Sequence, residues 1–316
     1  MHSVTTPVGD AQVPDVSLRC PRCRIAMYGV GCPTCGFRLR TRDGIADALL
    51  PERAAYYKRF IEEYERVREA EGRGSTNEDF YLALPYRDIS EKNAVQWRIR
   101  AKSFAYLVGR LLAEHNAVQQ GRILDIGAGN CWMSYRLALE GLRPYAVDLL
   151  TNDLDGLGAA RHYRRQLPKL FPRYRAEMSR LPFQSEQFDA AIFNASFHYA
   201  ESYEAALSEA LRCVKKKGLV LICDTAWYSN EESGQRMILE RREAFRVRHG
   251  TASDSIRSLE YLTDSRLHAL EQKFSIRWQR YSPWYGFRWA LRPVVAKLRG
   301  GREPSRFRIY AAWKEK

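Results

Sequence analysis

A tight glycine turn that follows a carboxylate is the first set of residues whose types and spacing fit a chemical role. Residues 122–126 read as a strand, the turn Gly127-Ala-Gly129 comes next, and residues 132–140 have the pattern of a helix. In this order the glycines let the backbone approach a ligand, and the helix start offers unpaired N–H groups. A dinucleotide site needs glycine at position 132, which is Trp132 here. Asp125 would repel a pyrophosphate, so we expect a nucleoside ligand that carries positive charge.

Four of the seven cysteines form two C-x-x-C pairs near the start of the chain, Cys20 with Cys23 and Cys32 with Cys35. Two such pairs can fold as the arms of a short hairpin with residues 28–31 at its tip, so that the thiolates converge on a tetrahedral Zn²⁺. Redox dithiols and an iron–sulfur cluster are the alternatives. Because all four ligands are thiolates, a zinc site would be structural. A segment of about 45 residues cannot build a stable core alone, so the metal would supply much of its folding free energy.

These groups need a scaffold, and the chain after the glycine turn alternates apolar strands with helical patterns, as in a parallel sheet. Asp148 ends the second strand, residues 144–148, about twenty residues beyond the turn, where a carboxylate accepts hydrogen bonds from ribose hydroxyls. Further strands are expected at residues 174–178, 188–196 and 218–224.

Two later segments complete this sheet. Residues 203–214 form an amphipathic pattern, and we expect that helix to end in the basic turn 215–217 with Gly218 as its C-cap. Residues 274–281 and 306–313 alternate like strands and are expected to form an antiparallel hairpin at the sheet edge.

A helical connector is expected between the cysteines and the sheet. Residues 49–71 carry an aromatic and aliphatic stripe that we expect to face the core: Tyr57, Phe60, Ile61, Tyr64 and Val67. Three further aromatic residues are candidates to line a ligand cleft: Tyr81, Tyr86 and Trp97. We therefore expect a zinc-ribbon module over 1–48, a helical connector that covers the cofactor cleft over 49–120, and a ligand-binding domain over 121–316.

Taken in order, the motifs of the last segment resemble those of class I S-adenosylmethionine-dependent methyltransferases, in the branch that includes the ubiquinone/menaquinone-biosynthesis type. The resemblance covers residues 121–316 and rests on Leu124-Asp-Ile-Gly-Ala-Gly-Asn130, Ala146-Val-Asp148, Glu177-Met-x-x-Leu-Pro-Phe183, Phe188-Asp189 and Cys213-Val-Lys-x-Lys-Gly218. It departs at Cys131, where the usual turn has a third glycine. It implies a Rossmann-like α/β fold with a seven-stranded sheet in the order 3-2-1-4-5-7-6.

The resemblance also implies a site for S-adenosylmethionine, whose ammonium and sulfonium explain the carboxylate before the turn. Asp125 would hold the methionine amino group, and the turn Gly127, Ala128 and Gly129 would admit the carboxypropyl chain. The other implied contacts are Asp148 with the ribose hydroxyls, Leu149 with the adenine face, Glu177 with the adenine N6 and the Met178 backbone close by, and Asn194 beside the reacting methyl group.

Catalysis of such a transfer depends mainly on alignment of the acceptor and exclusion of water, because the reaction is an in-line displacement. A general base is needed only for a poorly ionised acceptor. Asn194, His198 and Tyr199 lie after the strand 188–196, at the edge where the acceptor would bind. His198 has the pKa range of a base, and a plain wall residue is the alternative.

The segment 227–263 is the least like the family pattern, and we expect it to build the acceptor site. Its charged residues Glu231, Glu232, Arg241 and Arg242 are expected to form a solvated helix face.

The charge of the chain bears on its partners. The 51 basic and 37 acidic side chains give a formal net charge of +14, which suggests polyanionic partners, a membrane surface or an anionic substrate; a basic protein with no special partner is the alternative. Residues 277–308 contain nine basic residues, one acid and interleaved aromatic side chains. This segment fits RNA base stacking, a membrane surface bound through a helix at 285–298, or aromatic side chains packed under the sheet with arginines that reach to solvent.

Targeting signals are not expected. Residues 1–16 lack the features of a secretory signal, and no apolar run approaches the ~20 residues that span a bilayer. We expect a cytoplasmic location, where the seven cysteines are thiols or metal ligands.

The expected function is therefore S-adenosylmethionine-dependent methyl transfer to a small or lipid-linked, anionic metabolite. The first alternative is an RNA base methyltransferase that holds rRNA or tRNA with the zinc ribbon and the basic C-terminal region. Against it, Asn194-Ala-Ser-Phe197 stands where exocyclic-amine methyltransferases have Asn/Asp-Pro-Pro-Tyr/Phe. The second alternative is a non-catalytic regulator that only binds the cofactor.

Overall fold

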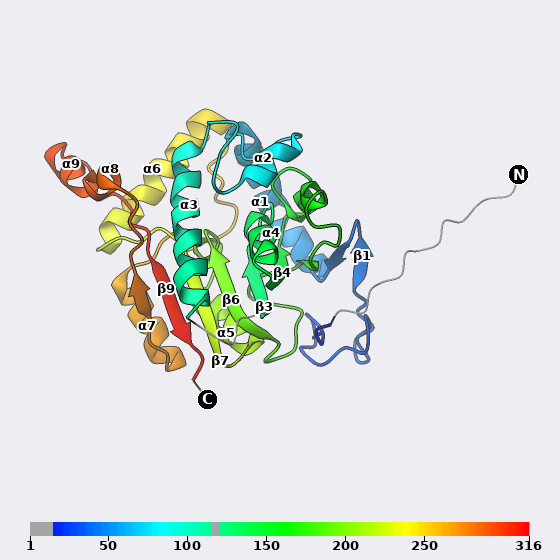
Figure 1. The fold of residues 1–316 in the computed structure, drawn as a ribbon. Helices are drawn as coiled ribbons and strands as arrows, with labels where there is room; N and C mark the ends of the chain where they lie inside the picture. The colour runs from blue at the N-terminus through cyan, green and yellow to red at the C-terminus, as the bar shows by residue number, and fades with distance from the viewer. Residues whose placement is uncertain (1–14, 115–120, 316) are drawn as a thin grey trace, which may run out of the picture.

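The structure is a computed structural model that describes residues 15–114 and 121–315, and one mixed sheet runs through it (Figure 1). The nine strands lie in the order β1-β2-β5-β4-β3-β6-β7-β9-β8. From β2 to β7 they run parallel, while β1, β9 and β8 pair antiparallel with their neighbours. Their bounds are β1 Arg40–Arg42, β2 Ile45–Asp47, β3 Arg122–Ile126, β4 Arg143–Asp148, β5 Arg173–Arg175, β6 Phe188–Asn194, β7 Val214–Cys223, β8 Gln279–Tyr281 and β9 Ile309–Trp313.

Seven of the strands confirm the predicted topology. Counted along the chain from β3, the order β5-β4-β3-β6-β7-β9-β8 is 3-2-1-4-5-7-6. The sequence did not predict that β1 and β2 would extend this sheet. In the structure β2 pairs in parallel with β5, with Ile45 opposite Arg173, and β1 folds back on β2.

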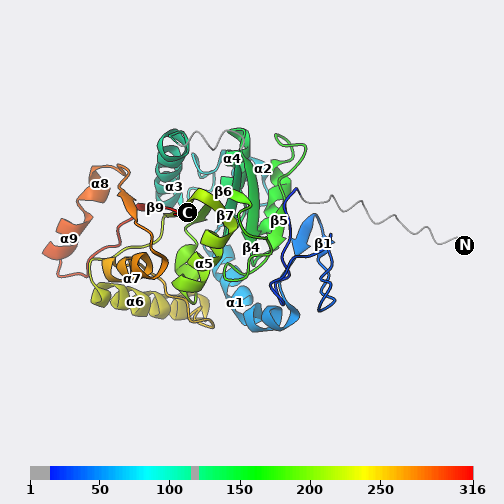
Figure 2. The ribbon, with the colours of Figure 1, turned by 90° about the horizontal axis from the view of Figure 1, so that it is seen from below.

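Helices cover both faces of the sheet (Figure 2). On one face lie α2, α3 and α4, and on the other lie α5 and α7, with α1 and α6 on the same side. Their bounds are α1 Pro51–Ala70, α2 Glu78–Ala83, α3 Ala94–Tyr106 with a π-helical continuation Leu107–Leu112, α4 Trp132–Leu139, α5 Tyr203–Cys213, α6 Glu231–His249, α7 Asp264–Phe274, α8 Phe287–Ala290 and α9 Arg292–Leu298.

Local capping explains where several helices begin. Ser202 accepts a hydrogen bond from the backbone of α5, Asn230 does so for α6 and Thr263 for α7. Such side chains satisfy N–H groups that lack a partner within the helix. Gly250, at φ +68, ends α6 in the left-handed conformation that glycine adopts readily.

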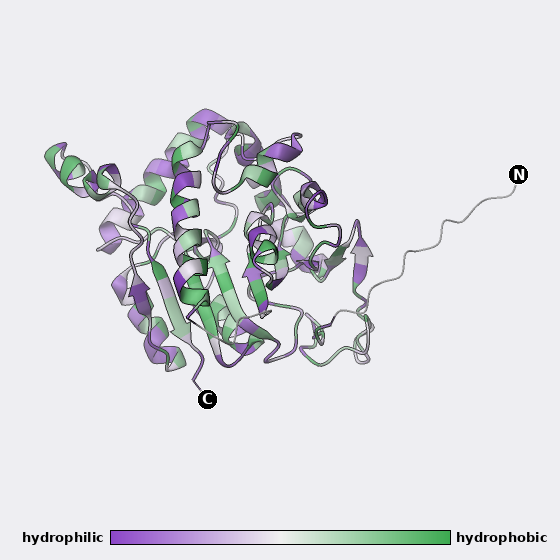
Figure 3. Ribbon diagram, in the orientation of Figure 1, coloured by the Kyte–Doolittle hydropathy of each residue, from purple (hydrophilic) through white to green (hydrophobic). Residues whose placement is uncertain are grey.

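The core consists of two apolar layers, one on each face of the sheet. Along β7, Val220 and Ile222 belong to one layer, whereas Leu219 and Leu221 belong to the other. Successive strand residues point to opposite faces, so a strand buried on both sides must be apolar throughout. Figure 3 shows this as nearly continuous green along the central strands.

The cysteine-bearing segment packs onto one of these layers. Val16 and Leu18 join the buried cluster that contains Phe183. The backbone N–H of Arg19 donates to the carbonyl of Pro182 at 3.0 Å. The segment and the sheet therefore share one apolar core.

Two details of the predicted elements are wrong. Gly218 does not cap α5, because that helix ends at Cys213 and residues 215–217 already lie inside β7, which pairs with β6 across a register shift. Residues 274–278 do not join the edge strand, because α7 continues to Phe274 while Leu267 and Leu270 bury its inner face. In the described ranges, no helix is long and apolar enough to cross a membrane.

Candidate functional site

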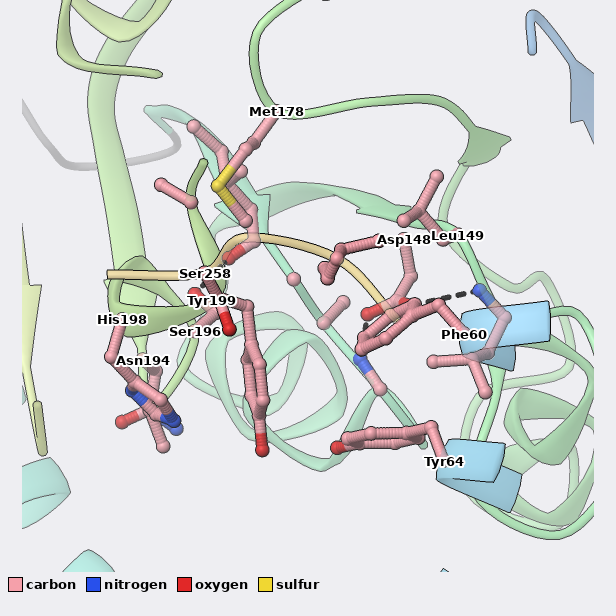
Figure 4. A pocket seen from close by; sticks show the side chains of 18 of the residues that line it. Phe60, Tyr64, Asp148, Leu149, Met178, Asn194, Ser196, His198, Tyr199 and Ser258 are labelled. Carbon is pink, nitrogen blue, oxygen red and sulfur yellow. Dashed lines mark hydrogen bonds between the residues drawn. The ribbon is translucent and has the colours of Figure 1, made fainter. Parts of the chain in front are cut away.

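A cavity of about 600 Å³ lies at the carboxyl ends of β3, β4, β6 and β7 and beneath α1 (Figure 4). Ligands of open α/β sheets bind in this position because adjacent strands end there beside the helix starts. The cavity brings together every predicted cofactor and acceptor residue: Asp125, Gly127, Ala128, Gly129, Asp148, Leu149, Glu177, Met178, Asn194, His198 and Tyr199.

The glycine turn forms the floor of the cavity. Gly127 and Gly129 have φ values of +75° and +53°, and the Gly127 N–H donates to the Val147 carbonyl at 2.8 Å. A Cβ atom on Gly127 would lie 2.3 Å from the Cβ of Ser196, so a side chain does not fit there. Cys131, in place of the third glycine, has φ +63° and starts α4. Its side chain is buried in the apolar cluster that contains Trp132 and does not line the cavity, so it takes no space from a ligand.

Asp125, the last residue but one of β3, has a carboxylate that is only half satisfied. Its Oδ2 accepts a hydrogen bond from Ser134 Oγ at 2.7 Å, whereas Oδ1 is buried without a partner in the described structure. Burial raises the pKa of Asp125 to about 7, and the nearby Asp148 adds to the shift. A buried acceptor of this kind is costly unless a ligand satisfies it. Asp125 therefore fits a cationic ligand group such as an ammonium.

Asp148 ends the neighbouring strand β4 and organises two loops. Its Oδ2 accepts from the Gly129 N–H at 2.8 Å, and its Oδ1 accepts from the Leu150 N–H at 2.8 Å (Figure 4). Burial raises the pKa of Asp148 to about 6 although these hydrogen bonds oppose the shift. Each carboxylate oxygen has a second lone pair, so both remain able to accept from a ligand hydroxyl. Leu149 follows and packs against the cluster around Phe60.

Glu177 and Met178 line the cavity beyond Leu149. The Oε2 atom of Glu177 accepts from Arg53 Nε at 2.9 Å and from the Tyr57 hydroxyl at 3.1 Å, both on α1. Among the described residues, Oε1 forms a long ion pair with the Arg180 guanidinium at 3.9 Å. Oε1 is therefore the oxygen able to accept a hydrogen bond from a ligand amine. Through Oε2, Glu177 also holds α1 over the cavity.

Asn194, His198 and Tyr199 form the opposite wall (Figure 4). His198 is half-buried and lines the cavity, and its Nδ1 is buried without a partner among the described residues. Burial lowers the pKa of His198 to about 4, so the ring is neutral at physiological pH. Tyr199 packs edge-on against Tyr64 of α1 at 5.5 Å. A neutral histidine of this kind suits hydrogen bonding to an acceptor better than strong base catalysis.

The predicted inward stripe of α1 is confirmed, and it has a second role that the sequence did not show. Tyr57, Phe60 and Val67 are buried as expected, and together with Tyr64 they also line the cavity. Their helical spacing identifies the inward side of α1 but not what fills the space beneath it. Of the three residues predicted to line the cleft, none does so: Tyr81 and Trp97 are buried in the core and Tyr86 is exposed.

Charged residues of the cavity were also missed. Arg241, predicted to lie on a solvated face, is half-buried and forms a bidentate ion pair with the buried Glu260. On α3, Arg100 faces the cavity, stacks on Trp97 at 4.7 Å and has no carboxylate partner among the described residues. Burial lowers its pKa to about 10, which leaves it charged at neutral pH. Arg100 is therefore a cation able to receive an anionic group.

The four N-terminal cysteines converge in a separate cluster, outside the cavity. Their sulfur atoms all lie within 4.8 Å of one another. Tyr28 and Gly31 exchange backbone hydrogen bonds of 3.0 and 3.1 Å at the predicted hairpin tip. A backbone hydrogen bond closes the loop of each C-x-x-C pair. The Cys20 N–H donates to the Ile25 carbonyl, and the Cys32 N–H donates to the Phe37 carbonyl. This donor set and geometry fit a tetrahedral zinc site.

Comparisons with known proteins agree with the geometry of the cavity. Residues 124–222, which run from within β3 through the glycine turn to within β7, match the family described as "Methyltransferase domain". The chain is 26% identical over 188 residues to demethylmenaquinone methyltransferase of Mycobacterium tuberculosis, covering 58% of this chain and 76% of that protein. It is 29% identical over 105 residues to a ubiquinone/menaquinone biosynthesis C-methyltransferase of Rhizobium leguminosarum, covering 33% and 41%.

Solved structures support the fold. Phosphoethanolamine N-methyltransferase 2 of Haemonchus contortus, in complex with S-adenosyl-L-methionine, superposes with a TM-score of 0.52 at 14% identity. The superposition covers 81% of this chain and 60% of that one. At 14% identity the likeness shows the fold alone, which is the arrangement of sheet and helices found in class I methyltransferases.

Proposed function

Because the chain contains a class I S-adenosylmethionine-dependent methyltransferase domain, we propose that it transfers the methyl group to a small or lipid-linked, anionic metabolite. The observation that carries the proposal is one cavity in which the glycine turn, the unpartnered oxygen of Asp125 and the unpaired guanidinium of Arg100 meet. The relatives are named for methylation of demethylmenaquinone and for ubiquinone/menaquinone biosynthesis, which favours a small-molecule acceptor.

Within the cavity each residue has a proposed part. Bound S-adenosylmethionine supplies an activated methyl group. Asp125 orients its ammonium, Asp148 holds the ribose hydroxyls with Leu149 beside the adenine, and Glu177 with the Met178 backbone receives the adenine amine. Gly127, Ala128 and Gly129 let the chain pass close to the backbone.

The acceptor side is the wall beside Asn194. Asn194 and the neutral His198 orient the acceptor, Tyr199 and the α1 aromatics exclude water, and Arg100 receives its negative charge. Alignment and water exclusion of this kind supply much of the acceleration of a displacement. This proposal needs no strong base, which agrees with the lowered pKa of His198.

We also propose that Cys20, Cys23, Cys32 and Cys35 hold a structural Zn²⁺. With four thiolate ligands the ion has no open position for a substrate. Its contribution is to fold a segment whose own core is small.

The RNA alternative has weaker support. Two of the arginines near the cysteines are occupied within the molecule, since Arg19 pairs with Glu209 and Arg22 with Glu52. The relatives named for quinone biosynthesis favour a small-molecule acceptor over RNA.

A labelled-methyl assay on fractionated cell extract tests the function. Purified protein and radiolabelled S-adenosylmethionine are added to separate RNA, lipid and small-molecule pools, with an Asp125→Ala variant as the blank. We expect label in the lipid or small-molecule pool. Label confined to RNA would establish the alternative, and cofactor binding without label in any pool would indicate a non-catalytic regulator.

A further inference from the structure

The residues that follow β8 form an arm that projects from the edge of the sheet opposite the cysteines (Figures 1 and 2). We call residues 284–302, which contain α8 and α9, the α8–α9 arm. Neither of its helices contains a buried residue. Phe287 is 77% exposed and Leu298 is 83% exposed, which is unusual for side chains of this size.

The exposed apolar side chains lie on one side of the arm. Phe287, Leu291, Val294 and Leu298 are exposed and follow one another at intervals of three or four residues, and the exposed Val295 stands next to Val294. In a helix this spacing places side chains on one face. Trp284, 60% exposed, precedes them. An aromatic residue next to an aliphatic face is typical of helices that lie in a membrane interface.

The charges of the arm are all positive. Residues 284–302 contain five basic residues and no acid. Arg288, Lys297 and Arg299 are exposed and pair with no carboxylate of the described residues. Unneutralised basic side chains beside an apolar face complement a surface that combines anionic headgroups with hydrocarbon. RNA would neutralise the charges but leave the apolar face in water.

The polar and aromatic side of the arm holds it to the rest of the molecule. Trp289 stacks on Phe307 at 5.3 Å, and the Arg292 guanidinium lies 3.1 Å from the centre of the Trp289 ring. The Tyr285 hydroxyl contacts Ser103 Oγ at 2.8 Å. The arm is therefore fixed at its base, while its apolar face has no protein to cover it in the described structure.

These anchoring contacts also connect the arm with the cavity. Ser103, which contacts Tyr285, donates a hydrogen bond of 2.5 Å to Asp224 Oδ1, and Asp224 lines the cavity. Phe307, on which Trp289 stacks, lines it as well.

We propose that the α8–α9 arm docks on the surface of an anionic phospholipid bilayer and thereby sets the acceptor side of the cavity beside the membrane. The inference rests on the proposed function in one respect, that an amphiphilic acceptor would reach the cavity from that membrane.

Sedimentation of the full-length protein with vesicles tests the docking. We expect at least tenfold more protein to sediment with phosphatidylcholine vesicles that contain phosphatidylglycerol than with phosphatidylcholine alone, and less at high salt. The double variant Phe287→Ser/Leu291→Ser should lose this binding at least tenfold, and Arg288→Glu/Lys297→Glu should do the same.

Matched controls keep the result specific to the arm. Leu239→Ser/Val247→Ser removes two side chains of α6 that are 64% and 77% exposed, and it should sediment like the unaltered protein. Arg38→Glu/Arg40→Glu, near the cysteines, controls for the change in charge. All variants should keep their affinity for S-adenosylhomocysteine in calorimetry, which shows that they fold. A blue shift of Trp284 fluorescence on vesicle addition, absent in Trp284→Phe, should locate the contact.

Several outcomes would overturn the proposal. These are no preference for anionic vesicles, an equal loss of binding in the control variants, or a concentration-dependent dimer that the arm variants abolish. Binding of RNA that depends on the arm, without vesicle binding, would do so too. The docking and the proposed function can fail independently. Methyl label in the lipid pool without vesicle binding would refute the docking alone. Vesicle binding with methyl label only in RNA would refute the proposed acceptor alone.

Discussion

At the scale of single residues, Asp125 has the environment that most constrains the ligand. The carboxyl is buried, Ser134 satisfies one oxygen, and the other is unpartnered in the described structure. Its pKa of about 7 lies above the ordinary value of about 3.9. Its contribution to stability in the unliganded protein is therefore complete below about pH 4 and is lost as the pH rises through about 7.

This environment predicts proton-linked binding of the cofactor. A cationic ligand favours the charged carboxylate, so affinity should rise by about tenfold between pH 5.5 and 7. Calorimetry with S-adenosylmethionine in buffers of different ionisation enthalpy should show proton release. Asp125→Asn should keep only a shallower dependence from Asp148, whose pKa is about 6, while His198 stays neutral throughout. An unchanged steep dependence in Asp125→Asn would remove Asp125 from the ammonium site.

Asp148 provides the second test at this scale. Asp148→Ala removes the acceptor proposed for the ribose hydroxyls together with the bonds from Gly129 and Leu150, so we expect cofactor affinity to fall at least tenfold, about 1.4 kcal/mol or more. Asp153→Ala, an exposed carboxylate in the following loop, is the matched control and should bind normally. Near-normal affinity of Asp148→Ala in calorimetry would refute the ribose assignment.

At the scale of elements, α1 links the cysteine segment to the cavity. Its side chains Tyr57, Phe60 and Tyr64 line the cavity, and Arg53 fastens it to Glu177. Its first turn is tied to the cysteine segment, because Glu52 accepts hydrogen bonds of 3.1 and 3.2 Å from Arg22. A change at the cysteines should therefore reach the cofactor site.

Removal of the metal tests this link. Cys32→Ser should abolish stoichiometric zinc in elemental analysis and lower the melting temperature by about 10 °C, since a structural metal contributes several kcal/mol. We also expect about tenfold weaker cofactor binding, because α1 loses its support. Cys213→Ala, a buried cysteine at the end of α5, should keep the zinc. Iron in place of zinc, or full stability without metal, would contradict the proposed ribbon.

The elements also show what the sequence reveals and what it does not. The strand order was implied by the resemblance to class I methyltransferases, which rests on ordered local motifs such as Ala146-Val-Asp148 that each lie within a few residues, and the structure confirms it. The pairing of β2 with β5 could not be foreseen, because Ile45-Ala-Asp47 is three residues long with no apolar run. The ion pair of Arg241 with Glu260 could not be foreseen for a related reason. The two residues are 19 positions apart in the sequence, and charged residues on a helix are expected to face solvent.

At the scale of the whole molecule, the cavity lies between two ends of different character. The cysteine segment extends one edge of the sheet and the α8–α9 arm projects from the other (Figure 1). The cavity itself is closed by α1 and the loop 253–260. Ligand binding in the cavity should therefore slow the motions of α1 and of loop 253–260 and leave α9 unaffected.

Hydrogen exchange measures this distribution. With S-adenosylhomocysteine bound, we expect slower exchange in the glycine turn, in α1 and in loop 253–260, because all three line the cavity. Exchange in α9 should not change, since its residues are not buried and do not line the cavity. Protection restricted to the turn, with α1 unaffected, would show that α1 does not close over the cofactor.

The parallel pairing of β2 with β5 has a consequence for synthesis of the chain. Ile45 needs Arg173 as its strand partner, and that residue is made about 130 residues later. At about 5–20 residues per second the interval is on the order of 10 s. Throughout it the cysteines are complete while the strand beside them has not been made, so the nascent segment would depend on the proposed Zn²⁺ for its fold. We expect a chelator added before induction to reduce the yield of folded protein far more than the same chelator added after translation stops.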